Sequence, residues 1–489
     1  MARIAFVQPQ LRDRAGIMAL SAVLKREGRH KCEVFVLQQS QNLLKEILEY
    51  EPTVIGFTCM SGEHIWARAF AKEIKVAKPS QFVIMGGVHP TIYPEVIESC
   101  EDLDAVCIGE GEYSLLKLVA CLESGDDFTD IANLWIRQGA EIIRNEVQPL
   151  IADLDSLPYM DRSIYYDKFP ILRDDSTKLF FVGRGCPHHC SYCHNHVMMR
   201  IYHGKGHWVR LRSVCHIIDE LKEVKEKYGY EWILFNDDTL NIKRDWFMEL
   251  MDRFENEIGA GFICNIRVDH LDEEIVERMV KAGCDRVIIG VEHGDYKIRR
   301  DILKRNITDE QLITISRAFS DRGVRVFTSS LIGLPGETVD DAYNTYKLLR
   351  AMHPTHSNAH VLEPYPRTAI YDYCSERGLL RKDYGWDSIT APAATFQYTS
   401  KALHKQGFVI EQPNMRELTN LKEFCHLLVH HPWAWPIVRL LIKLPHNRFF
   451  NSIWQWGIYG FKVKYAKGRR ERIDLTLRLL KHLVAGRGA

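Results

Sequence analysis

Three cysteines in one short stretch, residues 183–195, constrain the fold around them more than any other feature of the sequence. Cys186, Cys190 and Cys193 are separated by three and by two residues. With such short gaps the sulfurs cannot come from separate elements, so they must converge from one loop. Two glycines before the first cysteine allow this loop to turn tightly. Three thiolates suit an iron–sulfur cluster, and three ligands would leave one iron of a four-iron cubane open.

A zinc site is the alternative, because any of four nearby histidines could complete a Cys3His ligand set. These histidines are His188, His189, His194 and His196. A disulfide is less suited to this loop, since three cysteines leave one unpaired.

Tyr192, directly before the third cysteine, completes a C-x3-C-x-aromatic-C pattern that resembles the signature of the radical S-adenosylmethionine (SAM) enzymes. The resemblance implies a [4Fe–4S] cluster on Cys186, Cys190 and Cys193. It also implies that the open iron binds the amino and carboxylate groups of SAM, and that reductive cleavage yields a 5′-deoxyadenosyl radical. Such an enzyme would receive its electron from an external donor such as flavodoxin or ferredoxin.

Composition excludes several classes of protein. The 489 residues include 64 basic and 64 acidic side chains, so the overall charge indicates no nucleic acid partner. No secretory signal is visible at the N-terminus, and 13 cysteines without one favour a reducing compartment, the cytoplasm. No apolar run is long enough to predict a membrane-spanning helix.

The N-terminal region predicts an α/β domain, because short apolar runs alternate with helical stretches. The expected strands are 3–7, 32–36, 53–57, 82–85 and 105–108. This alternation favours an open, mostly parallel, Rossmann-like sheet, which binds ligands outside the carboxyl ends of its strands.

Three loops that leave those carboxyl ends carry paired glycines or small polar residues: 58–62, 86–90 and 109–112. They resemble the cobalamin (B12)-binding domain that many radical SAM enzymes contain, over roughly residues 1–140. The resemblance implies cofactor contacts at Thr58, Ser61, Gly86, Gly87, His89, Gly109 and Glu110. The Asp-x-His-x-x-Gly motif of cobalamin mutases is absent, since Asp13-Arg-Ala-Gly16 holds no histidine.

A polar, proline-punctuated linker is expected at 141–177, followed by a second βα series at 178–394. The expected strands are 179–182, 232–235, 262–267, 287–292, 324–331 and 361–363. This series predicts a partial TIM barrel, whose active site lies at the carboxyl ends of the strands.

Candidate SAM-binding residues follow those strands. The family resemblance implies roles for Asp237 and Asp238 near the methionine amino group, Arg267 near its carboxylate, Glu292 at the ribose, and Leu334 and Pro335 beside the adenine. Structural alternatives exist for most of them. An aspartate can cap a helix, an arginine can form an ion pair, and a proline–glycine turn can simply start a helix.

The C-terminal region, 395–489, is expected to be mainly helical and matches no catalytic motif. It is rich in aromatic residues and histidine, and residues 461–489 hold nine Lys or Arg against two acids. This composition favours either a helical cap on the barrel or peripheral contact with the inner membrane face. No nucleic-acid-binding motif accompanies it.

Together these features predict a B12-dependent radical SAM enzyme that methylates an unactivated carbon of a small, hydrophobic or lipid-like substrate. A radical-initiated oxidative cyclisation, as in anaerobic tetrapyrrole ring closure, is the second hypothesis. A non-catalytic zinc-binding protein is the third.

Overall fold

The computed structural model of this chain describes residues 1–389, 408–447, 450 and 453, which fall into two compact units. Among these residues, the first unit contains 1–188, 193–237 and 385–389, and the second contains 189–192, 238–384 and those from 408 onward. The domain boundaries expected at residues 140, 177 and 394 remain predictions. Much of the expected C-terminal region, 395–489, lies outside the described residues.

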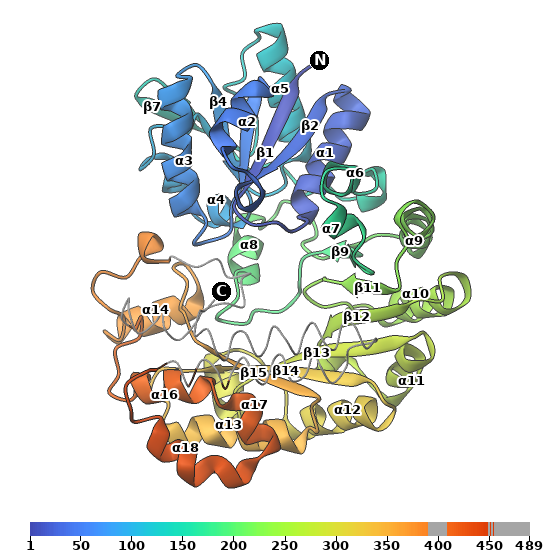
Figure 1. Ribbon diagram of the computed structural model, residues 1–489, viewed down its shortest axis with the longest axis vertical. Helices are drawn as coiled ribbons and strands as arrows, with labels where there is room; N and C mark the ends of the chain where they lie inside the picture. The colour runs from blue at the N-terminus through green and yellow to red at the C-terminus, as the bar shows by residue number, and fades with distance from the viewer. Residues whose placement is uncertain (390–407, 448–449, 451–452, 454–489) are drawn as a thin grey trace. The chain divides into compact units, whose positions relative to one another are not determined.

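The first unit is built on a mainly parallel sheet in the order β2-β1-β3-β4-β5-β6-β7 (Figure 1). Its parallel strands are β1 (Arg3–Gln8), β2 (Lys31–Val36), β3 (Val54–Thr58), β4 (Phe82–Gly86) and β5 (Ala105–Cys107). An antiparallel pair, β6 (Leu134–Gln138) and β7 (Glu141–Arg144), extends the edge. The predicted Rossmann-like sheet is confirmed, but the sequence reading missed the β6–β7 hairpin, which is short and polar at its turn.

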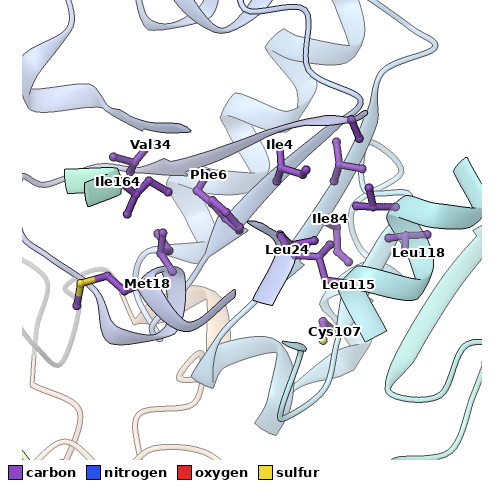
Figure 2. Close-up of a cluster of buried hydrophobic side chains, with 14 of the residues drawn as sticks. Ile4, Phe6, Met18, Leu24, Val34, Ile84, Cys107, Leu115, Leu118 and Ile164 are labelled. Atoms are coloured by element: carbon purple, nitrogen blue, oxygen red, sulfur yellow. The ribbon is translucent and has the colours of Figure 1, made fainter. Parts of the chain in front are cut away.

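Helices cover both faces of this sheet, because successive strand residues point to opposite sides. Ile4 and Phe6 of β1 pack with Met18 of α1 (Ala15–Gly28) and with the helix α5 (Glu112–Ser124), as Figure 2 shows. On the other face, Ala5 and Val7 join the core formed with α2 (Leu43–Glu49) and α3 (His64–Ala77).

Further helices and strands complete the first unit. They are α4 (Val88–Ile92), α6 (Ser163–Tyr166), α7 (Pro170–Arg173), β8 (Thr177–Phe180), β9 (Gly183–Arg184), α8 (Asn195–Ile201), β10 (Arg210–Leu211), α9 (Val214–Tyr228) and β11 (Trp232–Phe235). β8 pairs with β11 in parallel, and β9 pairs with β10 antiparallel. The cysteine loop runs from the end of β9 to the start of α8.

The second unit contains four parallel strands in the order β12-β13-β14-β15: β12 (Gly261–Ile266), β13 (Cys284–Glu292), β14 (Arg325–Ile332) and β15 (His356–Val361). Its described helices are α10 (Arg244–Glu257), α11 (Glu273–Lys281), α12 (Asp309–Asp321), α13 (Val339–Ala351), α14 (Ala369–Glu376), α16 (Met415–Lys422), α17 (Cys425–His430) and α18 (Trp435–Leu441). Capping boxes at Thr308 and Thr338 begin α12 and α13, and each satisfies two backbone N–H donors at the start of its helix. The predicted parallel α/β class is confirmed.

The last strand was placed wrongly by the sequence, which predicted it at 361–363. β15 begins five residues earlier, in a stretch too polar to suggest a strand. One of its polar side chains is paired within the sheet, since the hydroxyls of Thr328 and Ser357 lie 2.8 Å apart in a hydrogen bond. Among the helices described here, none combines the length and the apolarity that crossing a bilayer requires.

Candidate cofactor site

A cavity of about 370 Å³ opens at the carboxyl ends of β1, β3, β4 and β5 in the first unit. Apolar side chains and glycine backbone form most of its wall, including Phe6, Leu20, Ile84, Leu115, Gly16, Gly56, Gly86, Gly87, Gly109 and Gly111. Polar side chains from Glu110, Glu112, Arg184 and Arg210 line it on one side. This is the position at which an open parallel sheet binds a ligand.

Glycines in this wall let a flat ligand approach the backbone. A Cβ added at Gly16 would meet no atom within 4 Å, so its backbone borders open space. Gly87 has a φ of 102°, and a Cβ there would lie 2.7 Å from the Cys59 carbonyl oxygen. An apolar wall with exposed glycine backbone and a polar rim fits a large, flat group with polar substituents, such as a corrin.

Five of the seven residues predicted to contact cobalamin line this cavity: Thr58, Gly86, Gly87, Gly109 and Glu110. Ser61 and His89 are absent from its wall. Both are buried, and the Ser61 hydroxyl lies 3.3 Å from His89 Nδ1. The His89 ring stacks on His64 at 3.9 Å, and burial lowers the pKa of His89 to about 2, which favours the neutral imidazole. The predicted cofactor contacts at Ser61 and His89 remain predictions.

A buried ion network joins the cavity to the strand that precedes the cysteine loop. Arg184 of β9 donates to Glu110 at 2.7 Å and to Glu112 at 2.5 Å, and Arg210 of β10 lies 2.9 Å from Glu110. Burial raises the pKa of Glu110, but the two arginines more than offset this and hold it below its ordinary value. Glu110 is therefore charged, and its ion pairs fix β9 and β10 against the loop after β5.

Two aromatic residues continue this connection to the cysteine loop. The Tyr202 hydroxyl accepts a hydrogen bond from the Glu110 backbone N–H at 3.0 Å, and its ring stacks on Trp208. Trp208 in turn donates from Nε1 to the Cys186 carbonyl at 3.2 Å. Tyr202, Trp208 and Arg210 were not predicted from the sequence. Of the residues in this connection, only Arg184 lies inside the cysteine motif.

The sulfurs of Cys190 and Cys193 each have a polar neighbour within their own unit. Cys190 and Cys186 are buried and Cys193 is half-buried. The Arg267 guanidinium lies 3.7 Å from the Cys190 sulfur, and the Asn195 amide lies 3.5 Å from the Cys193 sulfur. Donors beside the sulfurs are the outer contacts that metal-ligating cysteines usually have. The loop thus fits an iron–sulfur cluster.

In the second unit, Glu292 lies at the carboxyl end of β13 in a strained conformation. Its φ is 66°, and the pairing of β13 with β14 shifts register at this point. Burial raises the pKa of Glu292, although Arg305 and a hydrogen bond from Tyr192 act in the opposite direction. A non-glycine residue with positive φ at a strand end is typical of functional sites, where neighbouring contacts maintain the strain.

Arg267 and Asp237 both have protein partners. Arg267 forms a bidentate salt bridge with Asp269, with N–O distances of 3.1 and 2.7 Å, and it also contacts the Cys190 sulfur. The Asp237 carboxylate accepts hydrogen bonds from the backbone N–H groups of Val182 and Gly183, at 3.1 and 2.9 Å. Asp237 thus supports the turn between β8 and β9, whereas Asp238 is exposed.

The predicted adenine segment is connected to the turn after Glu292. The carboxylate of Glu337 accepts a hydrogen bond from the Leu334 backbone N–H at 2.9 Å and lies 3.2 Å from His293 Nε2. Gln412 also contacts this segment, donating to the Leu334 carbonyl at 3.2 Å. Residues far apart in the sequence thus hold Leu334 and Pro335 in one turn.

Two family models match this chain. The B12 binding domain matches residues 13–119, and the Radical SAM superfamily matches residues 180–349. An uncharacterized methyltransferase of Pyrococcus horikoshii is 28% identical over 69% of this chain and 73% of its own length. The anaerobic magnesium-protoporphyrin IX monomethyl ester cyclase of Rubrivivax gelatinosus is 24% identical over 74% of this chain and 66% of its own.

Solved structures show the same fold. TsrM, a radical SAM methyltransferase from Kitasatospora setae solved with cobalamin and a [4Fe–4S] cluster, superposes with a TM-score of 0.71 at 16% identity, over 98% of this chain and 99% of TsrM. The cobalamin-dependent SAM radical enzyme OxsB gives 0.68 at 17% identity, over 99% of this chain and 75% of OxsB. These matches favour the cluster over the zinc alternative for the cysteine loop. The chain is a radical SAM enzyme with a B12-binding domain, and its cofactors are a [4Fe–4S] cluster, SAM and cobalamin.

Proposed function

We propose that this enzyme methylates an unactivated carbon of a small, hydrophobic substrate. The observation that carries the proposal is the cavity of the first unit, whose wall includes Arg184 and Trp208. Arg184 lies two residues before Cys186, and Trp208 donates to the Cys186 carbonyl. The cavity is thus connected to the cysteine loop, as expected where one substrate carbon must reach both cofactors. The methyltransferase of Pyrococcus horikoshii, similar over 73% of its length, also favours methyl transfer.

The bound cofactors would supply a 5′-deoxyadenosyl radical and a transferable methyl group. The protein's part is to hold and orient them. Cys186, Cys190 and Cys193 would ligate the cluster, with Arg267 stabilising the Cys190 thiolate. Glu292 can accept hydrogen bonds from the two ribose hydroxyls of SAM, since a carboxylate offers several acceptor positions.

Oxidative cyclisation is the second candidate, because the Rubrivivax gelatinosus cyclase is similar over 74% of this chain. Both reactions consume SAM as a radical source and leave 5′-deoxyadenosine. Only methyl transfer also uses SAM as a methyl source and leaves S-adenosylhomocysteine.

The two reactions can be separated before the substrate is known. The protein is reconstituted anaerobically with iron, sulfide and reduced cobalamin, and is then given SAM together with a low-potential reductant such as dithionite, which supplies the electron for SAM cleavage. We expect about one equivalent of S-adenosylhomocysteine to form per bound cobalamin. A Cys190→Ala variant should form the same amount of S-adenosylhomocysteine but no 5′-deoxyadenosine. Formation of 5′-deoxyadenosine without S-adenosylhomocysteine would favour cyclisation and refute the methyltransferase proposal.

A further inference from the structure

Four large apolar side chains lie exposed within twelve residues of the C-terminal part of the second unit. They are Trp433, Ile437, Leu440 and Leu444, with exposed fractions of 71, 57, 70 and 47%. Ile437 and Leu440 lie three residues apart on one side of α18 (Trp435–Leu441), while Trp433 lies in the 3-10 turn before this helix and Leu444 in the turn after it. We name this surface the Trp433 face. In the part of the second unit that the structure describes, it holds every large apolar side chain classed as exposed.

The opposite side of the same segment is anchored, so the orientation of the Trp433 face is fixed. The Trp435 ring stacks on Tyr343 of α13 with 3.9 Å between centroids and 5° between planes. Val438 and Ile442 are buried at 2 and 0% exposure. Figure 1 shows α18 at the edge of its unit, near α13, whose Tyr343 makes this ring contact.

Charge distinguishes this part of the sequence from the rest of a chain that is neutral overall. Between Glu423 and Glu471 the sequence contains no Asp or Glu, but it contains eight Lys or Arg. Two of these, Arg439 of α18 and Lys443 in the turn after it, belong to the described residues, and both are exposed. Arg439 makes one surface ion pair, with Asp340 at 3.1 Å. The two exposed cations beside the apolar side chains favour an anionic partner over a cationic one.

We propose that the Trp433 face docks on a membrane surface that contains anionic lipid. Tryptophan, leucine and isoleucine flanked by basic residues match the pattern of an amphipathic segment that lies in the bilayer interface. The apolar area, on the order of 500 Å², lies within the roughly 300–600 Å² of the largest patch on a typical monomer, which is often a functional surface. It is smaller than the roughly 800 Å² that each partner contributes to a stable protein dimer, which favours lipid over a second copy. A hydrophobic substrate would then be taken from, or returned to, the membrane.

Vesicle flotation of the full-length holoenzyme tests this proposal. The probes are phosphatidylcholine vesicles with and without phosphatidylglycerol. We expect the protein to float with the anionic vesicles, and an Ile437→Gln/Leu440→Gln variant to bind them at least about tenfold more weakly, since two apolar side chains are lost from the contact. Added salt should also weaken binding, through the basic residues.

Ile171→Gln serves as the matched control, because Ile171 is 71% exposed but belongs to the first unit. This variant should float like the natural protein. Unchanged circular dichroism and cofactor content would show that the double variant is folded. Equal flotation of the double variant and the natural protein would overturn the proposal. So would a dimer that the double variant dissociates in size-exclusion chromatography without any vesicle binding, since the occupant would then be a second copy.

Discussion

Replacing Arg184 by glutamine tests whether the ion network fixes the cobalamin loop to the strand before the cysteines. Arg184 donates to Glu110 and Glu112, whose side chains are only 12 and 6% exposed. Removing one partner of a buried pair leaves an uncompensated charge and costs about 3–5 kcal/mol. Two features reduce this cost. Arg184 itself is 30% exposed, and Arg210 still pairs with Glu110 at 2.9 Å. We therefore expect a loss of about 2 kcal/mol for Arg184→Gln.

Hydrogen exchange is the suitable assay, because a chain of two compact units cannot be assumed to unfold in one step. The peptide that spans Gly109 to Tyr113 reports local opening of the loop that carries both carboxylates. A loss of about 2 kcal/mol should speed its exchange by about 30-fold. The control is Arg144→Gln. Arg144 pairs with Glu98 at a similar distance, 2.8 Å, but both side chains are about half exposed, so its own peptide should change by less than about 1 kcal/mol.

A double variant separates charge from packing. If the cost arises from an uncompensated carboxylate, Arg184→Gln/Glu112→Gln should exchange more slowly than Arg184→Gln alone, because the Glu112 charge is then removed as well. The reasoning is refuted if Arg184→Gln exchanges within about threefold of the natural protein. It is also refuted if the two substitutions add without coupling.

Three further predictions follow from the sites. Cys190→Ala should abolish the absorbance of the [4Fe–4S] cluster and the release of 5′-deoxyadenosine, measured after anaerobic reconstitution. Gly87→Ala should weaken cobalamin retention on a desalting column, because the added Cβ would lie 2.7 Å from a backbone oxygen. Gly139→Ala is the control, since Gly139 has a φ of 64° but no atom within 4 Å of the added Cβ. This control should lower the free energy of unfolding by only the roughly 1 kcal/mol of the backbone conformation and should retain cobalamin. Burial lowers the pKa of His64 to about 4, so the native state binds this proton less tightly than the unfolded state does, and stability of the first unit should fall by up to about 3 kcal/mol as pH decreases from about 6.5 to 4. His64→Asn should flatten that part of the pH dependence, measured by hydrogen exchange of α3, and an unchanged slope would contradict the assignment.

The sequence alone was enough to predict an element or a site residue wherever a local pattern determines the structure. The five parallel strands of the first unit's large sheet, β1 to β5, were predicted to within two residues because each is a short apolar run between polar turns. The cavity wall was predicted in part for a related reason. Gly86, Gly87 and Gly109 line it through backbone at strand ends, and a glycine after an apolar run is visible in the sequence itself.

The sequence was not sufficient where a residue's role depends on a distant partner. Tyr202 bonds a backbone N–H that is 92 residues away, and Gln412 bonds a carbonyl 78 residues away. Nothing near either residue marks it as special. β15 was predicted five residues too late for the same reason, because the partner of its Ser357 hydroxyl, Thr328, is on β14, 29 residues away in the sequence.

Glu292 shows how local and distant determinants combine in one residue. Its motif, Gly-x-Glu before a turn, identified the residue from the sequence, but the motif did not indicate that the carboxylate lies beside Tyr192 of the cysteine loop and Arg305. A buried carboxylate with a raised pKa and a positive φ is costly to maintain, and its two neighbours only partly offset that cost. Hydroxyl donors from a ligand would stabilise the charged form further. Bound SAM should therefore stabilise the charged form of Glu292 more than that of an exposed carboxylate such as Asp238. Glu292→Gln should weaken SAM binding more than Asp238→Asn does, as measured by equilibrium dialysis.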